Sequence, residues 1–338
     1  MKAILLINLG SPKSTDPKDV KTYLAEFLMD EYVIDLPLFF RYLLVKGIIL
    51  NVRPKKSAEA YETIWWDEGA PLIVLSERVQ RKLQKITDYP VGLAMRYAEP
   101  SIHNGIKDLV EKHPEITDII AVPLYPHYAM ATTKTVIEKT DQVLNEHFPT
   151  LKVKYVDPFY DHPKYIDALS KSIGKHINEE TEHVLFSYHG IPVRHVKKTD
   201  PTKKHCYKNK DCCFIPNKAA HDVCYPHQVK VTTQLVIDQL KLPRDKWSWS
   251  FQSRLGLDEW LSPPTDKEIE RLAKSGIKNL AVCCPAFISD CLETLEEIGE
   301  EGEEIFHEHG GESFTLIPCL NDDDAWIECL HHLIQHQD

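Results

Sequence analysis

Short apolar runs rich in β-branched residues alternate with helical stretches along the whole chain, and no other feature of the sequence constrains the fold as much. The strand-like runs lie at 3–10, 91–98, 118–126, 152–159, 184–190, 247–254, 279–285 and 313–320. The helical patterns lie at 16–29, 71–86, 100–111, 164–178, 226–241, 265–275, 290–301 and 323–335. Strands that are apolar throughout and separated by helices indicate parallel sheets covered on both faces.

With 338 residues, the chain fits two domains of about 150 residues each better than one compact core. The alternation repeats in the second half, so we expect two doubly wound parallel-sheet domains with a cleft between them. The first would cover 1–160, with the helix at 322–338 packing back on it, and the second would cover 161–321. The hinge is expected near 157–165, where prolines and aromatic residues interrupt the pattern.

Composition excludes several classes of function. The net charge of −11, without a long basic run, disfavours nucleic acid as a partner. Glycine is sparse and neither a GxGxxG nor a P-loop pattern occurs, which argues against a bound nucleotide. No uncharged apolar stretch reaches the roughly 18 residues of a membrane span. The start, MKAILLINLG, lacks a signal-peptide cleavage site and is better interpreted as a buried strand.

One apolar segment has two interpretations. PLFFRYLLVKGIIL at 37–50 is either a helix packed in the core or an exposed apolar lip for a flat ligand or a membrane surface.

Several polar residues fall at or just after predicted strand ends, where doubly wound folds bind ligands. They are Arg96, Tyr125, His189, Ser253 and Arg254. In SYHGIP at 187–192 a sharp turn points His189 outward, although an isolated histidine beside a strand is often structural. Imidazole, with an ordinary pKa of about 6.5, accepts protons near neutral pH. Arg254 and Ser253 can clamp a carboxylate, and the nearby indole of Trp260 can stack on a flat aromatic ligand.

Carboxylates recur every fourth residue at Glu293, Glu297 and Glu301, and therefore share one helix face. Asp290 precedes them. In one interpretation Asp290 and Glu293 form a capping box and the others are solvated surface. In the other, the acidic face passes protons or cations. An imidazole facing such a row suits the deprotonation of a bound ligand while a metal ion is handed in.

Cysteines are concentrated at 203–228, which holds Cys206, Cys212, Cys213 and Cys224 together with His205, His221 and His227. Their spacing matches no zinc knuckle, but four thiolates suffice for a [2Fe–2S] cluster. Reduced, metal-free thiols are the alternative. The remaining cysteines lie in apolar strands and helices and are expected to be buried small residues.

Six segments, in order, resemble the ferrochelatases, the enzymes that insert Fe²⁺ into a porphyrin. They are INLGSP (7–12), LAMRYAEPSI (93–102), VPLYPHYAMATT (122–133), SYHGIP (187–192), FQSRLGLDEWLSPPTD (251–266) and ISDCLETLEE (288–297). The resemblance spans nearly the whole chain. It implies two Rossmann-like, chelatase-like domains with the porphyrin in the cleft between them.

The resemblance also implies roles for individual residues. His189 and Glu293 match a catalytic pair that faces the Fe²⁺ substrate from opposite sides of the macrocycle. Glu297 and Glu301, with Asp290, match a path for protons or metal. The expected porphyrin-binding residues are Tyr61, Arg96, Tyr97, Tyr125, Ser253, Arg254 and Trp260, of which Arg96 and Tyr97 match a pair on the side where metal enters. Some members carry histidine where this chain has Cys291, which removes any histidine relay there.

The expected activity is therefore insertion of Fe²⁺ into protoporphyrin IX in haem biosynthesis, with release of two protons; coproporphyrin III is the alternative substrate. The expected partners are a porphyrin and ferrous iron, with no nucleotide. Some microbial members of the family hold an iron–sulfur cluster through internal cysteines, and the segment 206–224 resembles that arrangement, which implies a [2Fe–2S] cluster. The expected location is cytoplasmic, either throughout or in peripheral contact with the inner face of a membrane. A non-catalytic tetrapyrrole or metal carrier and an iron–sulfur sensing protein are rival classes.

Overall fold

The computed structural model describes residues 1–254, 256 and 258–336, and the chain divides into two compact units. Unit 1 comprises Met1–Tyr125, Met130–Asp157 and Asn321–Asp338, and unit 2 comprises Pro126–Ala129 and Pro158–Leu320. Each unit contains a four-stranded sheet in which every paired strand is parallel. The predicted α/β class with two parallel sheets is confirmed.

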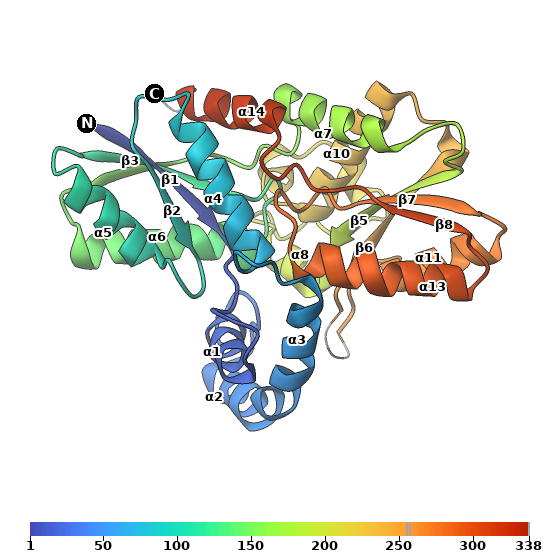
Figure 1. The fold of residues 1–338 in the computed structure, drawn as a ribbon, viewed down its shortest axis with the longest axis horizontal. Helices are drawn as coiled ribbons and strands as arrows, with labels where there is room; N and C mark the ends of the chain where they lie inside the picture. The colour runs from blue at the N-terminus through green and yellow to red at the C-terminus, as the bar shows by residue number, and fades with distance from the viewer. Residues whose placement is uncertain (255, 257, 337–338) are drawn as a thin grey trace. The chain divides into compact units, whose positions relative to one another are not determined.

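Unit 1 is built on a sheet of order β2-β1-β3-β4 (Figure 1). Its elements are β1 (Lys2–Asn8), α1 (Pro17–Leu28), α2 (Leu38–Tyr42), the π-helix η1 (Leu43–Ile49), α3 (Leu50–Ile64), α4 (Pro71–Gln84), β2 (Val91–Met95), α5 (Ile102–Lys112), β3 (Asp118–Pro123), the π-helix η2 (Met130–Lys134), α6 (Thr135–His147), β4 (Lys152–Tyr155) and α14 (Asp324–Gln335). One face of the sheet packs against α5 and α6 through an apolar cluster that includes Leu5, Ile106 and Val136.

The last helix, α14, belongs to unit 1 although it follows all of unit 2 in the sequence. It packs against α4, and Trp326 and Leu330 on it are fully buried. Lys82 of α4 binds Asp322 and Asp324 at 3.1 and 2.9 Å. In Figure 1 the strands of the sheet separate α14 from α5 and α6. The core of unit 1 is therefore completed only by α14, the last helix.

The apolar segment 37–50 is exposed, which decides between its two interpretations. It forms α2 and η1, which follow α1 and lead into α3, and α1 packs against α3. Its outward side chains, with two flanking residues, are Leu36, Leu38, Phe39, Phe40, Tyr42, Leu43, Ile48 and Val52. We call this set the apolar lip. No described helix is long and apolar enough to cross a membrane.

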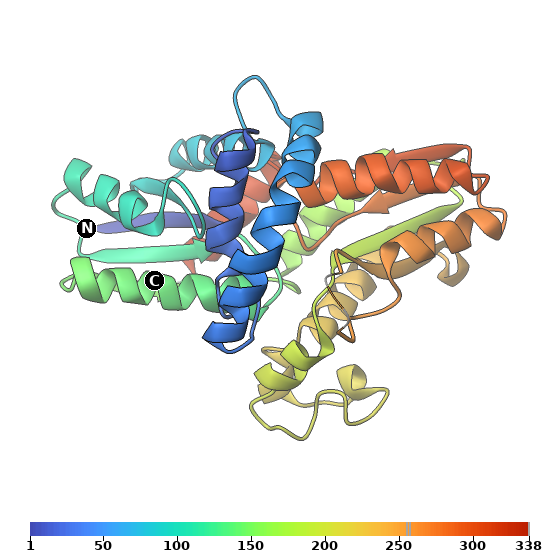
Figure 2. The same ribbon diagram turned by 90° about the horizontal axis from the view of Figure 1, so that it is seen from below.

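Unit 2 repeats the topology with a sheet of order β6-β5-β7-β8 (Figure 2). Its elements are α7 (Pro163–His176), β5 (His183–His189), α8 (Val193–Thr199), the 3-10 helix η3 (Cys212–Phe214), α9 (Lys218–His221), α10 (Tyr225–Leu240), the 3-10 helix η4 (Arg244–Lys246), β6 (Trp247–Gln252), α11 (Thr265–Lys274), β7 (Asn279–Cys283), α12 (Leu292–Thr294), the π-helix η5 (Leu295–Glu301), α13 (Gly302–Glu308) and β8 (Ser313–Leu316). Leu185, Val282, Leu272 and Phe306 share one apolar cluster, so α11 and α13 cover one face.

The predicted helix over 290–301 begins at Leu292 and is the first part of a longer run of three consecutive helical segments. A single α-helical turn, α12, is followed by the π-helix η5 and then by α13, which extends to Glu308. π-Helices are rare and occur mostly at functional sites. Periodicity alone does not separate a π-helix from an α-helix, because side chains four apart remain neighbours in both.

Gly10 lets the end of β1 pass close to the chain after β2. Its φ is +113°, and a Cβ there would lie 1.9 Å from the carbonyl oxygen of Tyr97. The same crossing is held by backbone hydrogen bonds from Arg96 to Asn8 and from Tyr97 to Leu9, at 2.8 and 2.9 Å. A side chain at position 10 would therefore push the Arg96–Tyr97 segment away.

We predict that Gly10→Ala lowers the free energy of unfolding by about 2 kcal/mol or more, because φ and contact distance both oppose a Cβ. Gly47→Ala is the matched control, since a Cβ there meets nothing within 4 Å and alanine favours helix. Thermal unfolding of both variants checks this prediction. Equal melting temperatures for the two variants would show that the crossing tolerates displacement.

Candidate functional site

The candidate site of unit 2 lies at the carboxyl end of its sheet. His189 is the last residue of β5 and Gln252 the last of β6, and the two are partners in the parallel ladder. Ser253 and Arg254 follow Gln252 directly, and Glu293 lies in α12, after β7. Parallel strands bring all their carboxyl ends to one edge, which is why residues more than a hundred positions apart gather there.

The contacts of His189 define which ring nitrogen is basic. Its Nδ1 lies 2.6 Å from the carbonyl oxygen of Gly190. A carbonyl only accepts hydrogen bonds, so Nδ1 carries the proton of the neutral ring and Nε2 keeps its lone pair. The backbone is held on both sides, because Tyr225 donates its hydroxyl to the His189 carbonyl at 2.9 Å and Gly190 donates its N–H to Gln252 at 2.7 Å. His189 thus presents one basic nitrogen from a fixed backbone.

The predicted capping box of Asp290 and Glu293 is wrong by one residue. The N-cap of α12 is Cys291, and its box partner is Thr294. Thr294 also donates its hydroxyl to Asp290 at 2.9 Å, and the buried Asp290 accepts the backbone N–H of Cys319 at 3.3 Å. Because Thr294 takes the capping role, the carboxylate of Glu293 is not needed for it. Asp290, by contrast, is engaged in holding the loop.

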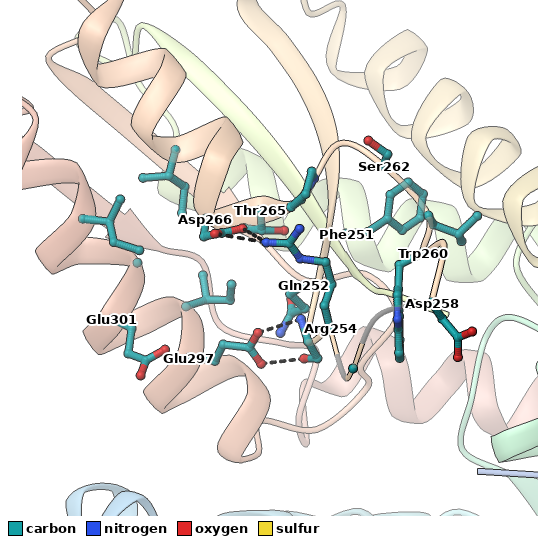
Figure 3. Close-up of a pocket in the computed structure, with 18 residues that line it drawn as sticks. Phe251, Gln252, Arg254, Asp258, Trp260, Ser262, Thr265, Asp266, Glu297 and Glu301 are labelled. Atoms are coloured by element: carbon teal, nitrogen blue, oxygen red, sulfur yellow. Dashed lines mark hydrogen bonds and ion pairs between the residues drawn. The ribbon is translucent and has the colours of Figure 1, made fainter. Parts of the chain in front are cut away.

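Glu297 is the most constrained carboxylate of the site (Figure 3). Ser253 donates its backbone N–H to one oxygen at 2.7 Å and its hydroxyl to the other at 2.5 Å. Both donors reach one carboxylate because Ser253 has a left-handed backbone with φ of 63°. Burial raises the pKa of Glu297 above its ordinary value, and the charge of Glu293 raises it further, whereas the Ser253 bonds and the charge of His189 lower it. Glu297 therefore interacts electrostatically with both His189 and Glu293.

A cavity of about 580 Å³ in unit 2 adjoins Glu297. Glu297 and Glu301 line it from η5, and Ser253, Arg254 and Trp260 line it from the segment after β6. Arg254 pairs with Asp266 at 3.2 Å inside it (Figure 3). His189 and Glu293 are not among its described lining residues. Glu297 therefore stands between the edge that bears His189 and this cavity.

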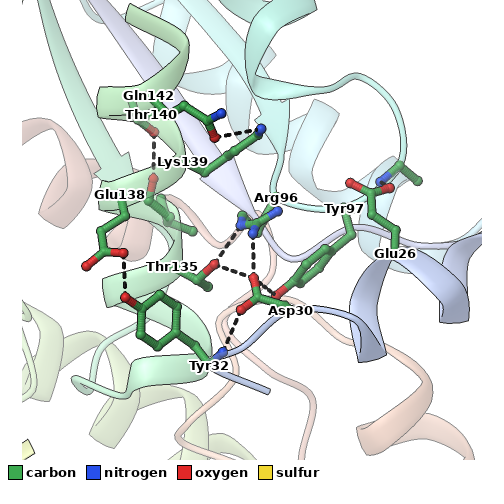
Figure 4. Close-up of polar contacts among 12 residues, drawn as sticks. Glu26, Asp30, Tyr32, Arg96, Tyr97, Thr135, Glu138, Lys139, Thr140 and Gln142 are labelled. Atoms are coloured by element: carbon green, nitrogen blue, oxygen red, sulfur yellow. Dashed lines mark hydrogen bonds and ion pairs between the residues drawn. The ribbon is translucent and has the colours of Figure 1, made fainter. Parts of the chain in front are cut away.

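The predicted site residues Arg96 and Tyr97 of unit 1 belong to a cluster around a buried carboxylate (Figure 4). Arg96 forms an ion pair with Asp30 and donates to Thr135 at 2.8 Å. Tyr97 and Thr135 also donate their hydroxyls to Asp30, at 3.0 and 2.6 Å. Burial raises the pKa of Tyr97 well above its ordinary value, with the charge of Asp30 acting in the same direction.

The other two predicted residues of unit 1 are largely enclosed. Tyr61 is buried on α3 and contacts the ring of Trp65 edge to face, with 6.0 Å between centroids. Tyr125 packs against the α5–α6 side of the sheet, and its buried hydroxyl has no hydrogen-bond partner among the described residues. Burial raises the pKa of Tyr125 above its ordinary value.

The four cysteines of the 203–228 segment come together in unit 2. All four are buried, and their side chains shift one another's pKa: Cys224 lowers the pKa of Cys206, and Cys206 and Cys213 raise that of Cys224. The bond from Cys224 lowers the pKa of Cys213 to about 6, with Lys230 contributing. Within the described ranges, no group of three or more His, Cys, Asp or Glu is arranged to hold a metal ion. The four thiols thus form one buried group whose members act on one another electrostatically.

Histidines pack beside the thiols. His205 and His227 contact the backbone carbonyls of Cys212 and Cys213 at 2.7 and 2.6 Å, and the rings of His221 and His227 stack 3.6 Å apart. Burial lowers the pKa of His227 below its ordinary value.

Two solved structures share the fold. SirB from Bacillus subtilis with Fe³⁺ matches with a TM-score of 0.56 and 14% identity, over 99% of this chain and 95% of that chain. The sirohydrochlorin chelatase SirB from Bacillus subtilis subspecies spizizenii in complex with cobalt matches with a TM-score of 0.53 and 11% identity, over 99% and 94%. At such low identity the likeness concerns the fold, which is an α/β fold of the chelatase type.

Comparison with related sequences identifies one family within this class of fold. The ferrochelatase family model matches residues 1–338. The ferrochelatase of Pseudomonas fluorescens (strain Pf0-1) is 50% identical over 98% of this chain and 97% of the relative, and that of Stutzerimonas stutzeri (strain A1501) is 48% identical over the same shares. The chain belongs to the ferrochelatase family, a family of enzymes, as the six sequence segments predict.

Proposed function

We propose that this chain inserts Fe²⁺ into protoporphyrin IX, with release of two protons, as a step of haem biosynthesis. The observation that supports this best is the single basic nitrogen of His189 beside the carboxylates Glu293 and Glu297, at the carboxyl edge of a parallel sheet, in a member of the ferrochelatase family.

The reaction requires that two inner N–H groups of the porphyrin lose their protons as the metal binds. Nε2 of neutral His189 accepts such a proton, while Nδ1 stays bonded to Gly190. Once His189 is charged, it favours the ionised form of Glu297, whose raised pKa allows proton exchange closer to neutral pH. Imidazole and carboxylate ligands hold Fe²⁺ without the tight binding of thiolates. His189 and Glu293 are the proposed catalytic pair, and Glu297, Glu301 and Asp290 the proposed path for protons or metal.

The residues proposed to contact porphyrin are described for each unit separately. In unit 2, Arg254 and Trp260 line the cavity beside Glu297, where a guanidinium suits a propionate and an indole a flat ring. Ser253 acts there chiefly by holding Glu297. In unit 1, Tyr61, Arg96, Tyr97 and Tyr125 remain proposals from the family resemblance. Arg96 and Tyr97 would act as part of the Asp30 cluster.

We predict that His189→Ala lowers the rate of metallation by about 100-fold or more while porphyrin affinity stays unchanged, because only the proton acceptor is lost. Glu293→Gln should also lose turnover at unchanged affinity. His113→Ala, in unit 1 and with a side chain that is only partly buried, is the control. Anaerobic Fe²⁺ insertion is measured with protoporphyrin IX and coproporphyrin III side by side.

An active His189→Ala enzyme would overturn the role of His189. Porphyrin binding without turnover in the unmodified protein would instead identify a carrier. A higher kcat/KM with coproporphyrin III would replace the proposed substrate.

We further propose that Cys206, Cys212, Cys213 and Cys224 hold a [2Fe–2S] cluster. Four buried thiols in mutual contact supply the donor set that such a cluster takes. The contacts between the sulfur atoms would be replaced by bonds to iron, and the cluster would supply a redox-active iron site to unit 2.

Protein purified without oxygen is expected to show the visible absorption of an iron–sulfur cluster and to contain two iron and two sulfide ions per chain, about the stoichiometry of a [2Fe–2S] cluster. Cys224→Ser should abolish the absorption, and Cys319→Ser, outside the group, should keep it. A colourless, iron-free protein, or a cluster that survives Cys224→Ser, would contradict this assignment.

We also propose that the apolar lip contacts a membrane surface. Its eight exposed apolar side chains are adjoined by Lys46, Arg53, Lys55 and Lys56, the combination typical of a segment that lies in a lipid interface.

A further inference from the structure

A second surface, in unit 2, carries a dense group of lysines. Seven exposed lysines lie between the end of α8 and the start of α9, and we call them the lysine surface: Lys197, Lys198, Lys203, Lys204, Lys208, Lys210 and Lys218. In Figure 2 this yellow-green part of the chain extends away from the β5–β8 sheet. The whole chain has a net charge of −11, so this local excess of positive charge is opposite in sign to the charge of the chain as a whole.

Three aspartates, Asp200, Asp211 and Asp222, offset only part of the charge of the seven lysines. Asp200 is buried and accepts the backbone N–H groups of Thr202, His205 and Cys206 at 2.9 Å each. Burial alone would raise the pKa of Asp200, but these hydrogen bonds lower it below its ordinary value. Its charge therefore fixes the turn that presents the lysines. Asp211 is exposed, and Asp222 pairs with Lys218 at 2.8 Å.

Apolar side chains are exposed among the lysines. Phe214 is 66% exposed, Ile215 42% and Tyr207 40%. The ammonium group of Lys197 lies 5.6 Å from the ring centre of Tyr207, and that of Lys230 lies 5.0 Å from the ring centre of Phe214. Charge and apolar area are therefore intermixed on one surface, as in segments that lie at a lipid interface.

The presence of lysine rather than arginine on this surface favours a lipid over a protein as its binding partner. Between 197 and 218 every basic residue apart from histidine is a lysine, without an arginine. Lysine is depleted from protein–protein interfaces, where arginine is enriched for its directional hydrogen bonds. Lysine suits the diffuse field of an anionic bilayer, to which each contributes about 1 kcal/mol of attraction.

We propose that the lysine surface binds anionic phospholipid headgroups, with Phe214 and Ile215 entering the interface. This surface is distinct in sequence from the apolar lip and independent of the proposed activity. The two are distinguishable by their chemistry, because the lysine surface requires negative lipid whereas the lip does not.

The test is sedimentation with vesicles of phosphatidylcholine alone and of phosphatidylcholine with phosphatidylglycerol, using the Phe39→Ser/Phe40→Ser protein to weaken the lip. We expect about tenfold tighter binding or more to the anionic vesicles, with the difference lost at high salt. Lys203→Ala, Lys204→Ala, Lys208→Ala and Lys210→Ala combined should remove most of the difference. The same four-charge change at Lys107, Lys112, Lys152 and Lys154, exposed in unit 1, is the control and should retain it.

Equal binding to both vesicles would overturn the proposal. So would equal losses in the two four-lysine variants, or displacement of the protein from anionic vesicles by polyglutamate or RNA at matched charge concentration, which would indicate a macromolecular partner.

A different observation carries a second inference, which rests on the proposed function: Gln252 joins the two halves of the candidate catalytic pair. Its backbone carbonyl accepts the N–H of Gly190, next to His189, at 2.7 Å. Its side-chain Nε2 donates to the backbone carbonyl of Glu293 at 2.6 Å. The residue is buried and also faces His189 in the β5–β6 ladder.

The orientation of the Gln252 amide is fixed from both ends. The Glu293 carbonyl can only accept, so the nitrogen must face it. The oxygen accepts the hydroxyl of Ser187 at 2.7 Å. Ser187 continues a buried chain through Thr265 to Ser250, with steps of 2.9 and 2.8 Å.

We infer that Gln252 is a positioning residue that sets the distance between His189 and Glu293. Gln252→Met removes both side-chain hydrogen bonds, whereas Gln252→Glu keeps an acceptor for Ser187 and loses the donor to Glu293. Both variants should lower kcat by about tenfold or more while the KM for porphyrin stays within about twofold, since misplacement of catalytic groups affects the reaction more than binding.

Ser250→Ala, at the far end of the same buried chain, is the matched control and should keep kcat even if the melting temperature falls. Normal kcat in Gln252→Glu, or losses of kcat that follow melting temperature across all three variants, would overturn this inference. Porphyrin binding without turnover in the unmodified protein would instead overturn the proposed function.

Discussion

The β5–β6 ladder determines the geometry of the candidate site in unit 2. It sets His189 beside Gln252, and from that pair the chain continues on one side to Gly190 and on the other to Ser253. Position 190 requires glycine, because a Cβ there would lie 2.7 Å from the backbone carbonyl oxygen of Gln252. Ser253 then reaches Glu297 with two hydrogen bonds. One register of hydrogen bonds thus places an imidazole, an amide and a carboxylate.

Asp30 and Glu297, one carboxylate in each unit, are stabilised in different ways. Asp30 is compensated by the charge of Arg96 and by hydroxyl groups, so it serves as a fixed anchor for that part of unit 1. Glu297 accepts hydrogen bonds only from the neutral donors of Ser253, and its burial, together with the charge of Glu293, raises its pKa. A buried acid without a cationic partner suits proton exchange, whereas one with such a partner suits structure.

Much of the fold and the location of the site could be predicted from sequence, because both depend on local patterns. Apolar runs broken by helix specify parallel sheets, and polar residues at their ends locate the functional edge. The N-cap was not predictable to the residue: Asp290 suits that position better than Cys291, which is the observed N-cap, and Asp290 is instead bonded to the backbone of Cys319. The roles of Asp30 and Gln252 could not be predicted, because each acts through partners that are distant in the sequence. Exposure of the segment 37–50 depends on packing that composition does not encode.

The return of α14 to unit 1 affects how the chain is made. The strands of unit 1 are complete once Tyr155 has been synthesised, but Trp326 and Leu330, which finish its core, follow only after the whole of unit 2. At about 5–20 residues per second, synthesis from the end of α4 to the start of α14 would leave α4 without its α14 partner for roughly 12–48 s. During translation, the second unit is therefore synthesised while the first still exposes an apolar face of α4. A chaperone that shields this face would protect the chain most during this interval.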